Sequence, residues 1–229
     1  MIGVTVATSK RGRLWPTEHW KPLIDSLCRG GAKHDPRLRY PGLARYLSPP
    51  LFPVRIRDLD ARVMFHDVPE GPFEVGPFEV TAAAVVHPGP TVGYRIKERD
   101  TVVAYLPDHE PALGGGEFGP RWTSGFDLAV GADLLIHDAQ YTAAERTQRV
   151  GWGHSSIDEA VRLAAAAEAR QLVLFHHDPA HDDATLDRLT SAAAGQARRL
   201  GGRVAISGGQ EGDRYEVAPV AVSARADAG

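Results

Sequence analysis

Residues 87–110 read HPGPTVGYRIKERDTVVAYLPDHE, and this stretch decides the kind of fold. Gly93–Ile96 and Thr101–Leu106 are rich in β-branched and aromatic residues and flank the polar residues KERD, which is typical of a hairpin. His87 closes the β-rich segment before this hairpin, and Asp108 follows its second strand. Two side chains that can bind a metal are therefore expected where strands meet loops.

Strands and helices alternate in the second half of the chain. Ser156 and Glu159 have the spacing of a capping box, so a helix is expected to begin there. Another helix is expected from Asp182 or Asp183. Between them Gln171–Phe175 is apolar enough for a strand buried on both faces. Further strands are expected at Arg62–His66, Phe78–Val86, Asp133–Ile136 and Arg203–Ser207. This order predicts a layered α/β domain with helices against a sheet.

Composition excludes several classes of protein. The chain of 229 residues has 26 basic and 29 acidic residues and no basic stripe with interleaved aromatic residues, which gives nucleic-acid binding little support. Cys28 is the only cysteine, so an intrachain disulfide and a cysteine zinc cluster are excluded. No apolar run approaches the ~20 residues of a membrane span. A cytoplasmic protein without a membrane partner is expected.

His176 adds a third metal-binding residue type at the end of a strand, Gln171–Phe175. Loops at strand ends are exposed yet held by a rigid sheet, and α/β folds place their sites there. Imidazole and carboxylate ligands together suit zinc, manganese or iron. Spacing alone leaves open the alternative that His87, Asp108 and His176 are unrelated polar residues.

Five blocks of the sequence, in order over roughly residues 48–208, resemble the metallo-β-lactamase superfamily. They are HPGPTVGYRI, TVVAYLPDHEPAL, DLLIHDAQYT, GWGHSSIDEAVRLA and LVLFHHDPAHDD. The resemblance is greatest to the tRNase Z-like and cyclic-phosphodiesterase-like branches. It implies an αββα layered architecture, incomplete on its N-terminal side, with the domain at residues 48–219. Residues 1–47 are then an atypical N-terminal segment, and residues 220–229 a flexible tail.

The resemblance also implies roles for single residues. His87 would bind the first metal, His176 the second, and Asp108 would bridge both. His154 would act near the leaving group as a general acid or charge stabiliser, so the catalytic residues would be His154 and Asp108. Asp138 would be an outer acceptor that orients a ligand histidine.

Four further histidines are not expected to bind a metal directly. His177 would point to the opposite face from His176 if the strand continued. His177 and His181 are both expected behind the metal ligands or at the rim of the substrate site, His181 near the start of the second helix. His109 and His137 are expected to form local hydrogen bonds or to pack.

The superfamily's H-x-H-x-D-H motif, which precedes the block at His87, is absent. The only histidines before His87 are His19, His34 and His66, and none of them lies two residues from another. The remaining set gives each metal two ligands, fewer than the three that catalytic zinc normally has, so weak metal binding and poor hydrolysis are expected. Three explanations stay open: a wrongly assigned start of a longer protein, a degraded gene, or reassigned ligands among His109, His154 and His177.

The resemblance implies phosphodiester hydrolysis by a hydroxide that bridges two divalent metals, zinc or else manganese or iron. The substrate would be a small-molecule or nucleotide phosphoester. Because the superfamily also hydrolyses β-lactams, thioesters and lactones, this substrate class is an analogy. The alternative is a non-catalytic pseudo-enzyme or interaction module on the same scaffold. A homodimer is left open.

Overall fold

The computed structural model describes residues 49–50, 71–89, 91–111, 120–201 and 203–217. The chain divides into two compact units, Met1–Ala82 and Ala83–Gly229. The expected strand Arg62–His66, the segment 1–47 and the tail 220–229 lie outside the described residues. All candidate site residues belong to the second unit.

The described part of the first unit is mainly a hairpin. Strand β1 (Pro72–Val75) pairs antiparallel with β2 (Phe78–Val85), and Val75 lies opposite Phe78. Gly76 in the two-residue turn has a φ of 60°, a conformation that glycine adopts without steric cost. The last residues of β2 already belong to the second unit.

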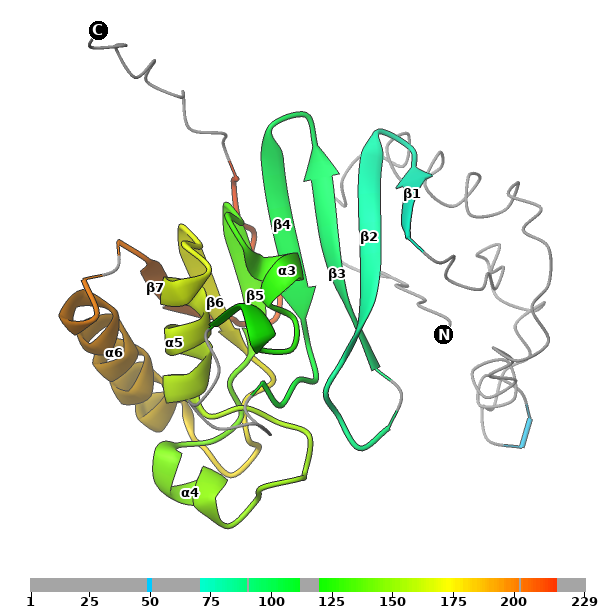
Figure 1. The fold of residues 1–229 in the computed structure, drawn as a ribbon. Helices are drawn as coiled ribbons and strands as arrows, with labels where there is room; N and C mark the ends of the chain where they lie inside the picture. The colour runs from blue at the N-terminus through cyan, green and yellow to red at the C-terminus, as the bar shows by residue number, and fades with distance from the viewer. Residues whose placement is uncertain (1–48, 51–70, 90, 112–119, 202, 218–229) are drawn as a thin grey trace, which may run out of the picture. The chain divides into compact units, whose positions relative to one another are not determined.

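The second unit is built on a mixed sheet whose strands follow one another in chain order (Figure 1). After the end of β2 these are β3 (Thr91–Glu98), β4 (Thr101–Leu106), β5 (Leu134–Asp138), β6 (Gln171–Phe175) and β7 (Ala205–Gly208). β3 and β4 form an antiparallel hairpin, and β4, β5, β6 and β7 are parallel. The carboxyl ends of β4, β5 and β6 therefore meet at one edge of the sheet.

The helices described in this unit are α3 (Phe126–Ala129), α4 (Ala143–Thr147), α5 (Ile157–Ala166) and α6 (Asp183–Arg199), with the 3₁₀ turn η4 (Pro120–Trp122) before α3. Helices α3, α5 and α6 lie on one face of this sheet, whereas the short α4 lies beyond the strand ends (Figure 1). α5 packs on β5 and β6, and α6 packs on β7 and α5. No helix among the described residues has the length and apolar content needed to cross a membrane.

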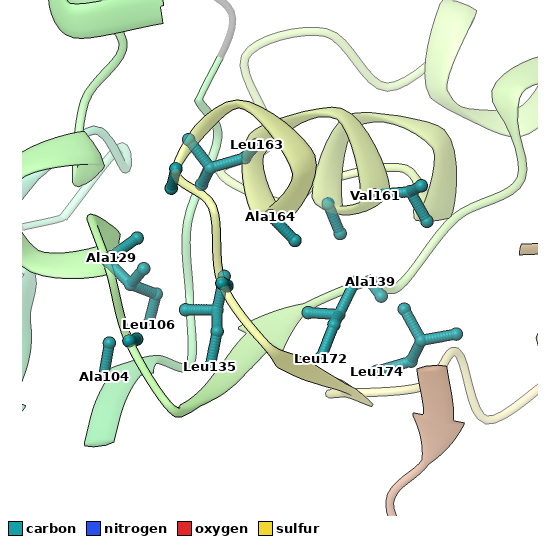
Figure 2. Packing of buried hydrophobic residues seen from close by; sticks show 14 of the residues in the cluster. Ala104, Leu106, Ala129, Leu135, Ala139, Val161, Leu163, Ala164, Leu172 and Leu174 are labelled. Carbon is teal, nitrogen blue, oxygen red and sulfur yellow. The ribbon is translucent and has the colours of Figure 1, made fainter. Parts of the chain in front are cut away.

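The core lies between this helix layer and the sheet (Figure 2). Leu172 and Leu174 of β6 are buried on the face toward α5, where Val161 and Ala164 lie above them. The small alanine side chains of α5 let the helix approach the sheet closely. Each buried leucine or valine contributes about 1.5–3 kcal/mol relative to an exposed one, so this layer fixes α5 and the loop that precedes it.

Most of the expected elements are confirmed. β4 and β6 have the expected bounds, and Ser156 and Glu159 form the expected capping box. α6 begins as expected, with Asp182 as its N-cap. β5 differs from the expected strand Asp133–Ile136, because it extends to Asp138. His137 and Asp138 are therefore strand residues rather than loop residues. The layered α/β class is confirmed.

Candidate metal and catalytic centre

Four side chains meet at the edge of the sheet where parallel strands end. Asp108 lies two residues beyond β4, Asp138 is the last residue of β5, and His176 directly follows β6. His154 comes from the loop between α4 and α5. One nitrogen or carboxylate oxygen from each of these residues lies within 4.8 Å of the corresponding atom of every other. We call these residues the four-residue group.

Direct contacts hold the group together. The His154 Nδ1 atom lies 2.6 Å from Asp138 Oδ2, and His176 Nδ1 lies 3.4 Å from Asp108 Oδ1. The two imidazole rings stack with centroids 4.7 Å apart. Asp138 is fully buried, whereas Asp108 and His176 keep 41% and 31% of their side chains exposed. The group therefore has a buried base and an open side that a ligand can reach.

His176 has an unusual backbone. Its φ is 59°, in the left-handed region that residues with a β-carbon rarely occupy. β6 has already ended at Phe175, so the alternation of a strand does not decide where His176 and His177 point. Strain of this kind clusters at functional sites, where the surrounding structure maintains it.

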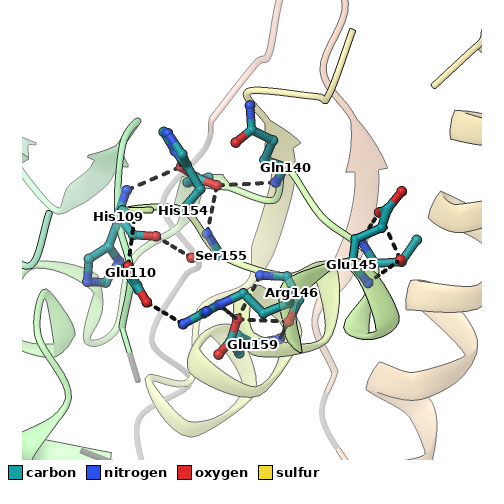
Figure 3. A network of polar contacts seen from close by, with 12 residues as sticks. His109, Glu110, Gln140, Glu145, Arg146, His154, Ser155 and Glu159 are labelled. Atoms are coloured by element: carbon teal, nitrogen blue, oxygen red, sulfur yellow. Dashed lines mark hydrogen bonds and ion pairs between the residues drawn. The ribbon is translucent and has the colours of Figure 1, made fainter. Parts of the chain in front are cut away.

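Asp138 organises the base of the site by contacting His109, Gln140, His154 and Ser155, which are labelled in Figure 3. Besides His154, its carboxylate accepts hydrogen bonds from the backbone N–H groups of His109 (3.2 Å), Gln140 (3.2 Å) and Ser155 (3.0 Å). The hydrogen bond from His154 raises the pKa of that imidazole above its usual value, and burial opposes the shift. The family resemblance implies that Asp138 orients a ligand histidine; the imidazole that it contacts is His154, which the resemblance places near the leaving group.

His87 lies beside the group but outside it. Its ring packs edge-on against His154, with centroids 5.5 Å apart, and its Nδ1 lies 3.1 Å from the backbone nitrogen of Gly89. Gly153 adjoins the same ring so closely that a β-carbon there would lie 2.3 Å from His87 Cδ2. The predicted role of His87 as a metal ligand stays a prediction.

The two predicted rim histidines contact other parts of the unit. His177 Nε2 lies 3.3 Å from the carbonyl oxygen of Gly209. His181 Nε2 lies 3.0 Å from Glu145 Oε1 on α4. Burial alone would raise the pKa of Glu145, but hydrogen bonds from Thr142 and His181 lower it to about 2. Neither histidine belongs to the four-residue group.

A buried histidine pair supports the base of the site. His109 Nδ1 lies 2.9 Å from His137 Nε2, and both residues have no exposed surface. Burial lowers the pKa of His109 to about 2 and also lowers that of His137, so both imidazoles are neutral. This agrees with the expected local role, in packing and hydrogen bonding.

Sequence reasoning missed Glu110 and Arg146. The fully buried Glu110 carboxylate lies 2.6 Å from Arg146 Nη2 (Figure 3). It also accepts hydrogen bonds from the N–H groups of Gly151 and Gly153. Arg146 lies on α4, a short helix with no apolar periodicity to reveal that it is buried. The only signal was the charge of Glu110 two residues after Asp108.

A family model described as the beta-lactamase superfamily domain matches residues 27–177, more than half of the chain. The chain belongs to this superfamily. The match confirms the resemblance seen in the five sequence blocks and the layered fold that it implies.

Curated relatives of this superfamily member include ribonucleases. The chain is 27% identical to ribonuclease BN of Erwinia tasmaniensis, over 55% of this chain and 52% of that protein. It is 37% identical to ribonuclease Z of Pyrococcus furiosus, over 36% of this chain and 23% of that protein. The chain thus spans at most about half the length of these relatives.

Two solved structures are similar to parts of the chain. The metallo-β-lactamase fold protein YhfI from Bacillus subtilis superposes with a TM-score of 0.48 at 25% identity, over 62% of this chain and 52% of that one. The short form of human tRNase Z gives a TM-score of 0.40 at 30% identity, over 47% and 38% of the two chains.

The four-residue group of this superfamily member fits a divalent cation. It offers two imidazoles and two carboxylates, the donor types that zinc, manganese and iron accept. Two of the three predicted metal residues, Asp108 and His176, belong to it. The other two members, Asp138 and His154, contact each other at 2.6 Å.

Proposed function

We propose that this chain carries the active site of a metal-dependent phosphodiester hydrolase. The observation that carries the proposal is the contact of 2.6 Å between His154 and the buried Asp138, beside the open pair Asp108 and His176. Membership of the superfamily and the ribonuclease relatives support hydrolysis of a phosphodiester. In this proposal Asp108 and His176, together with His87, which lies against His154, would hold two divalent ions, of which zinc is the first candidate.

His154 is the proton donor in the proposed reaction. Its Nδ1 faces Asp138, which leaves Nε2 as the ring nitrogen available to a substrate. The Asp138 carboxylate favours the imidazolium form, so a proton is held close to where the leaving alcohol oxygen would lie. Transfer of this proton to the oxygen neutralises the charge that develops as the P–O bond breaks.

The metal would supply the complementary function. A bound divalent ion polarises the phosphoryl oxygens and lowers the pKa of a bound water toward neutrality. Asp108 and His176 reach the open side of the group, and their exposure leaves room for a phosphate. Asp138, held by three backbone N–H groups, keeps the base of the site rigid when a ligand arrives.

RNA is the first substrate to test, because the curated relatives are named ribonucleases. The near balance of 26 basic and 29 acidic residues gives this chain no general attraction to a polyanion. We therefore propose that recognition depends on the scissile phosphate and its neighbours. A small nucleotide phosphodiester would then be cleaved as well as RNA.

The test combines metal analysis of the purified full chain with assays on bis(p-nitrophenyl) phosphate, a cyclic nucleotide and a short RNA. We expect the wild type to bind added divalent metal, Asp108→Asn to bind it more weakly, and His154→Gln to react about 10²–10⁴-fold more slowly. Asp133→Asn is the matched control, since this carboxylate lies before β5, at the opposite end of the strand from Asp138. A wild-type chain without bound metal or activity would support the non-catalytic pseudo-enzyme or interaction module instead.

A further inference from the structure

We propose that Glu110, together with Arg146, is a positioning residue that holds His154 and His87 in their places beside the four-residue group. The proposal rests on the function proposed above. It follows from the contacts that Glu110 makes with segments far apart in the sequence.

Glu110 joins three segments that carry site residues. It follows Asp108 by two residues, and its backbone N–H donates to the carbonyl of Val86, the residue before His87 (2.9 Å). Its side chain accepts from Gly151 N–H at 2.8 Å and from Gly153 N–H at 2.7 Å. Gly153 directly precedes His154, so one buried side chain fixes the approach to that histidine.

The chemistry of this position requires an ionised carboxylate. Two backbone N–H groups and the Arg146 guanidinium point at the two oxygens, so at least three donors need acceptors there. A neutral amide would turn its own N–H₂ group toward one of these donors. Hydrogen bonds to a charged partner are also about twice as strong as neutral ones, which suits a part that must stay fixed.

Arg146 extends the network to the helix layer. Its Nη2 contacts Glu110, and its Nε lies 3.3 Å from Glu159 Oε2. Glu159 is itself the capping-box residue of α5, bonded to Ser156. The loop with His154 is therefore anchored both to the segment with Asp108 and to the start of a packed helix (Figure 3).

The close approach of Gly153 to His87 shows why the position of this loop matters. A β-carbon at Gly153 would come within 2.7 Å of His87 Nε2 and 2.4 Å of Pro88 Cδ. The loop and the His87 segment are thus in contact, and both are tied to Glu110. A shift of the loop moves His154 relative to Asp138 and frees space at His87.

A second buried carboxylate provides a matched control. Asp133 pairs with Arg170 at 2.8 Å and accepts the N–H of Val102 at 2.9 Å, which resembles the surroundings of Glu110. It lies at the start of β5, whereas the site lies at the end of that strand. Asp133→Asn should therefore destabilise the same unit without reaching His154.

The experiment measures the His154 imidazole directly by ¹H–¹⁵N NMR of the full chain, with a chelator present so that the signal does not depend on metal. Because loss of a charge-assisted hydrogen bond weakens the loop, we expect Glu110→Gln to speed exchange of the His154 Nδ1 proton by about tenfold or more. Asp133→Asn should leave this rate within about twofold of the wild type, as expected for distant sites. The free energy of unfolding of both variants is measured in urea.

Equal His154 exchange rates in Glu110→Gln and Asp133→Asn would overturn the proposal and leave Glu110 a general stabiliser. If Glu110→Gln does not fold, Arg146→Lys decides, because lysine keeps the charge but cannot contact Glu110 and Glu159 together. Faster His154 exchange in Arg146→Lys supports the proposal, and an unchanged rate refutes it. The proton exchange needs no substrate, so a failure of the proposed phosphodiesterase function would be seen separately.

Discussion

Replacement of Gly153 by alanine tests how tightly the loop with His154 is fitted against His87. The added β-carbon would lie 2.3 Å from His87 Cδ2, 2.4 Å from Pro88 Cδ and 2.7 Å from His87 Nε2. All three separations are shorter than atoms tolerate, so the loop or the His87 segment must move. Gly153 also has a φ of 96°, which an alanine adopts only with strain.

The magnitude follows from two contributions. The positive φ costs an alanine about 1–2 kcal/mol. Overpacking against the imidazole and the proline adds about 1–3 kcal/mol. We therefore expect Gly153→Ala to lower the free energy of unfolding by about 2–5 kcal/mol. The same displacement should reduce metal content and phosphodiesterase activity, because it moves His154 and His87 apart.

Gly151→Ala is the matched control. Gly151 lies in the same loop, also donates its N–H to Glu110, and has a φ of 82°, but a β-carbon there meets nothing within 4 Å. Gly151→Ala should therefore lower the free energy of unfolding only by the backbone contribution of about 1–2 kcal/mol. Both variants are compared by urea unfolding and by metal content. Equal losses in the two variants would show that the contact between Gly153 and His87 is not tight, and would refute the reasoning.

Three further outcomes follow from the site and its surroundings. Asp138→Asn removes the carboxylate that raises the pKa of His154, so the upper pH limit of phosphodiesterase activity should move to lower pH; an unmoved limit in the pH–rate profile would assign the proton donor elsewhere. Glu145 has a pKa of about 2 when folded and 4.5 when unfolded, so its contribution is complete above pH 4.5 and is lost as the pH falls toward 2. Because the side chain is partly exposed, that contribution is about 1 kcal/mol. The double variant His181→Gln/Glu145→Gln should lack this loss of unfolding free energy between pH 4.5 and pH 2. Ser156→Ala removes the N-cap of α5 and should cost about 1 kcal/mol in thermal or urea unfolding, whereas no change would mean that the helix start is held by packing alone.

Local patterns in the sequence predicted the elements whose patterns are strong. The apolar run Gln171–Phe175 predicted β6, and the β-branched and aromatic content of Thr101–Leu106 predicted β4, each with its bounds. The capping signature gave the start of α5, and Asp182 gave that of α6. These signals are local, so they survive without knowledge of the tertiary structure. The five-residue helix α4 carries its own capping box at Thr142 and Glu145 but has no apolar stripe, and it was missed.

The candidate site was predictable only in part. The ends of parallel strands meet at one edge, so Asp108 and His176 could be placed near each other from the order of strands. His154 and Asp138 were predicted as site residues only from the family resemblance. Their direct contact is visible only in the structure. Glu110 could not be found from the sequence, because its importance lies in contacts with Gly151 and Gly153, which follow it by about forty residues.

The left-handed backbone of His176 sets thermodynamic stability against function at one position. Glycine would relieve the roughly 1–2 kcal/mol that a β-carbon costs there, and asparagine tolerates that conformation better than most residues. Either replacement would remove the imidazole that stacks on His154. Selection for a more heat-resistant chain would therefore favour replacements of His176 that remove this proposed metal ligand. Such a trade-off between stability and activity is common where an active site is strained.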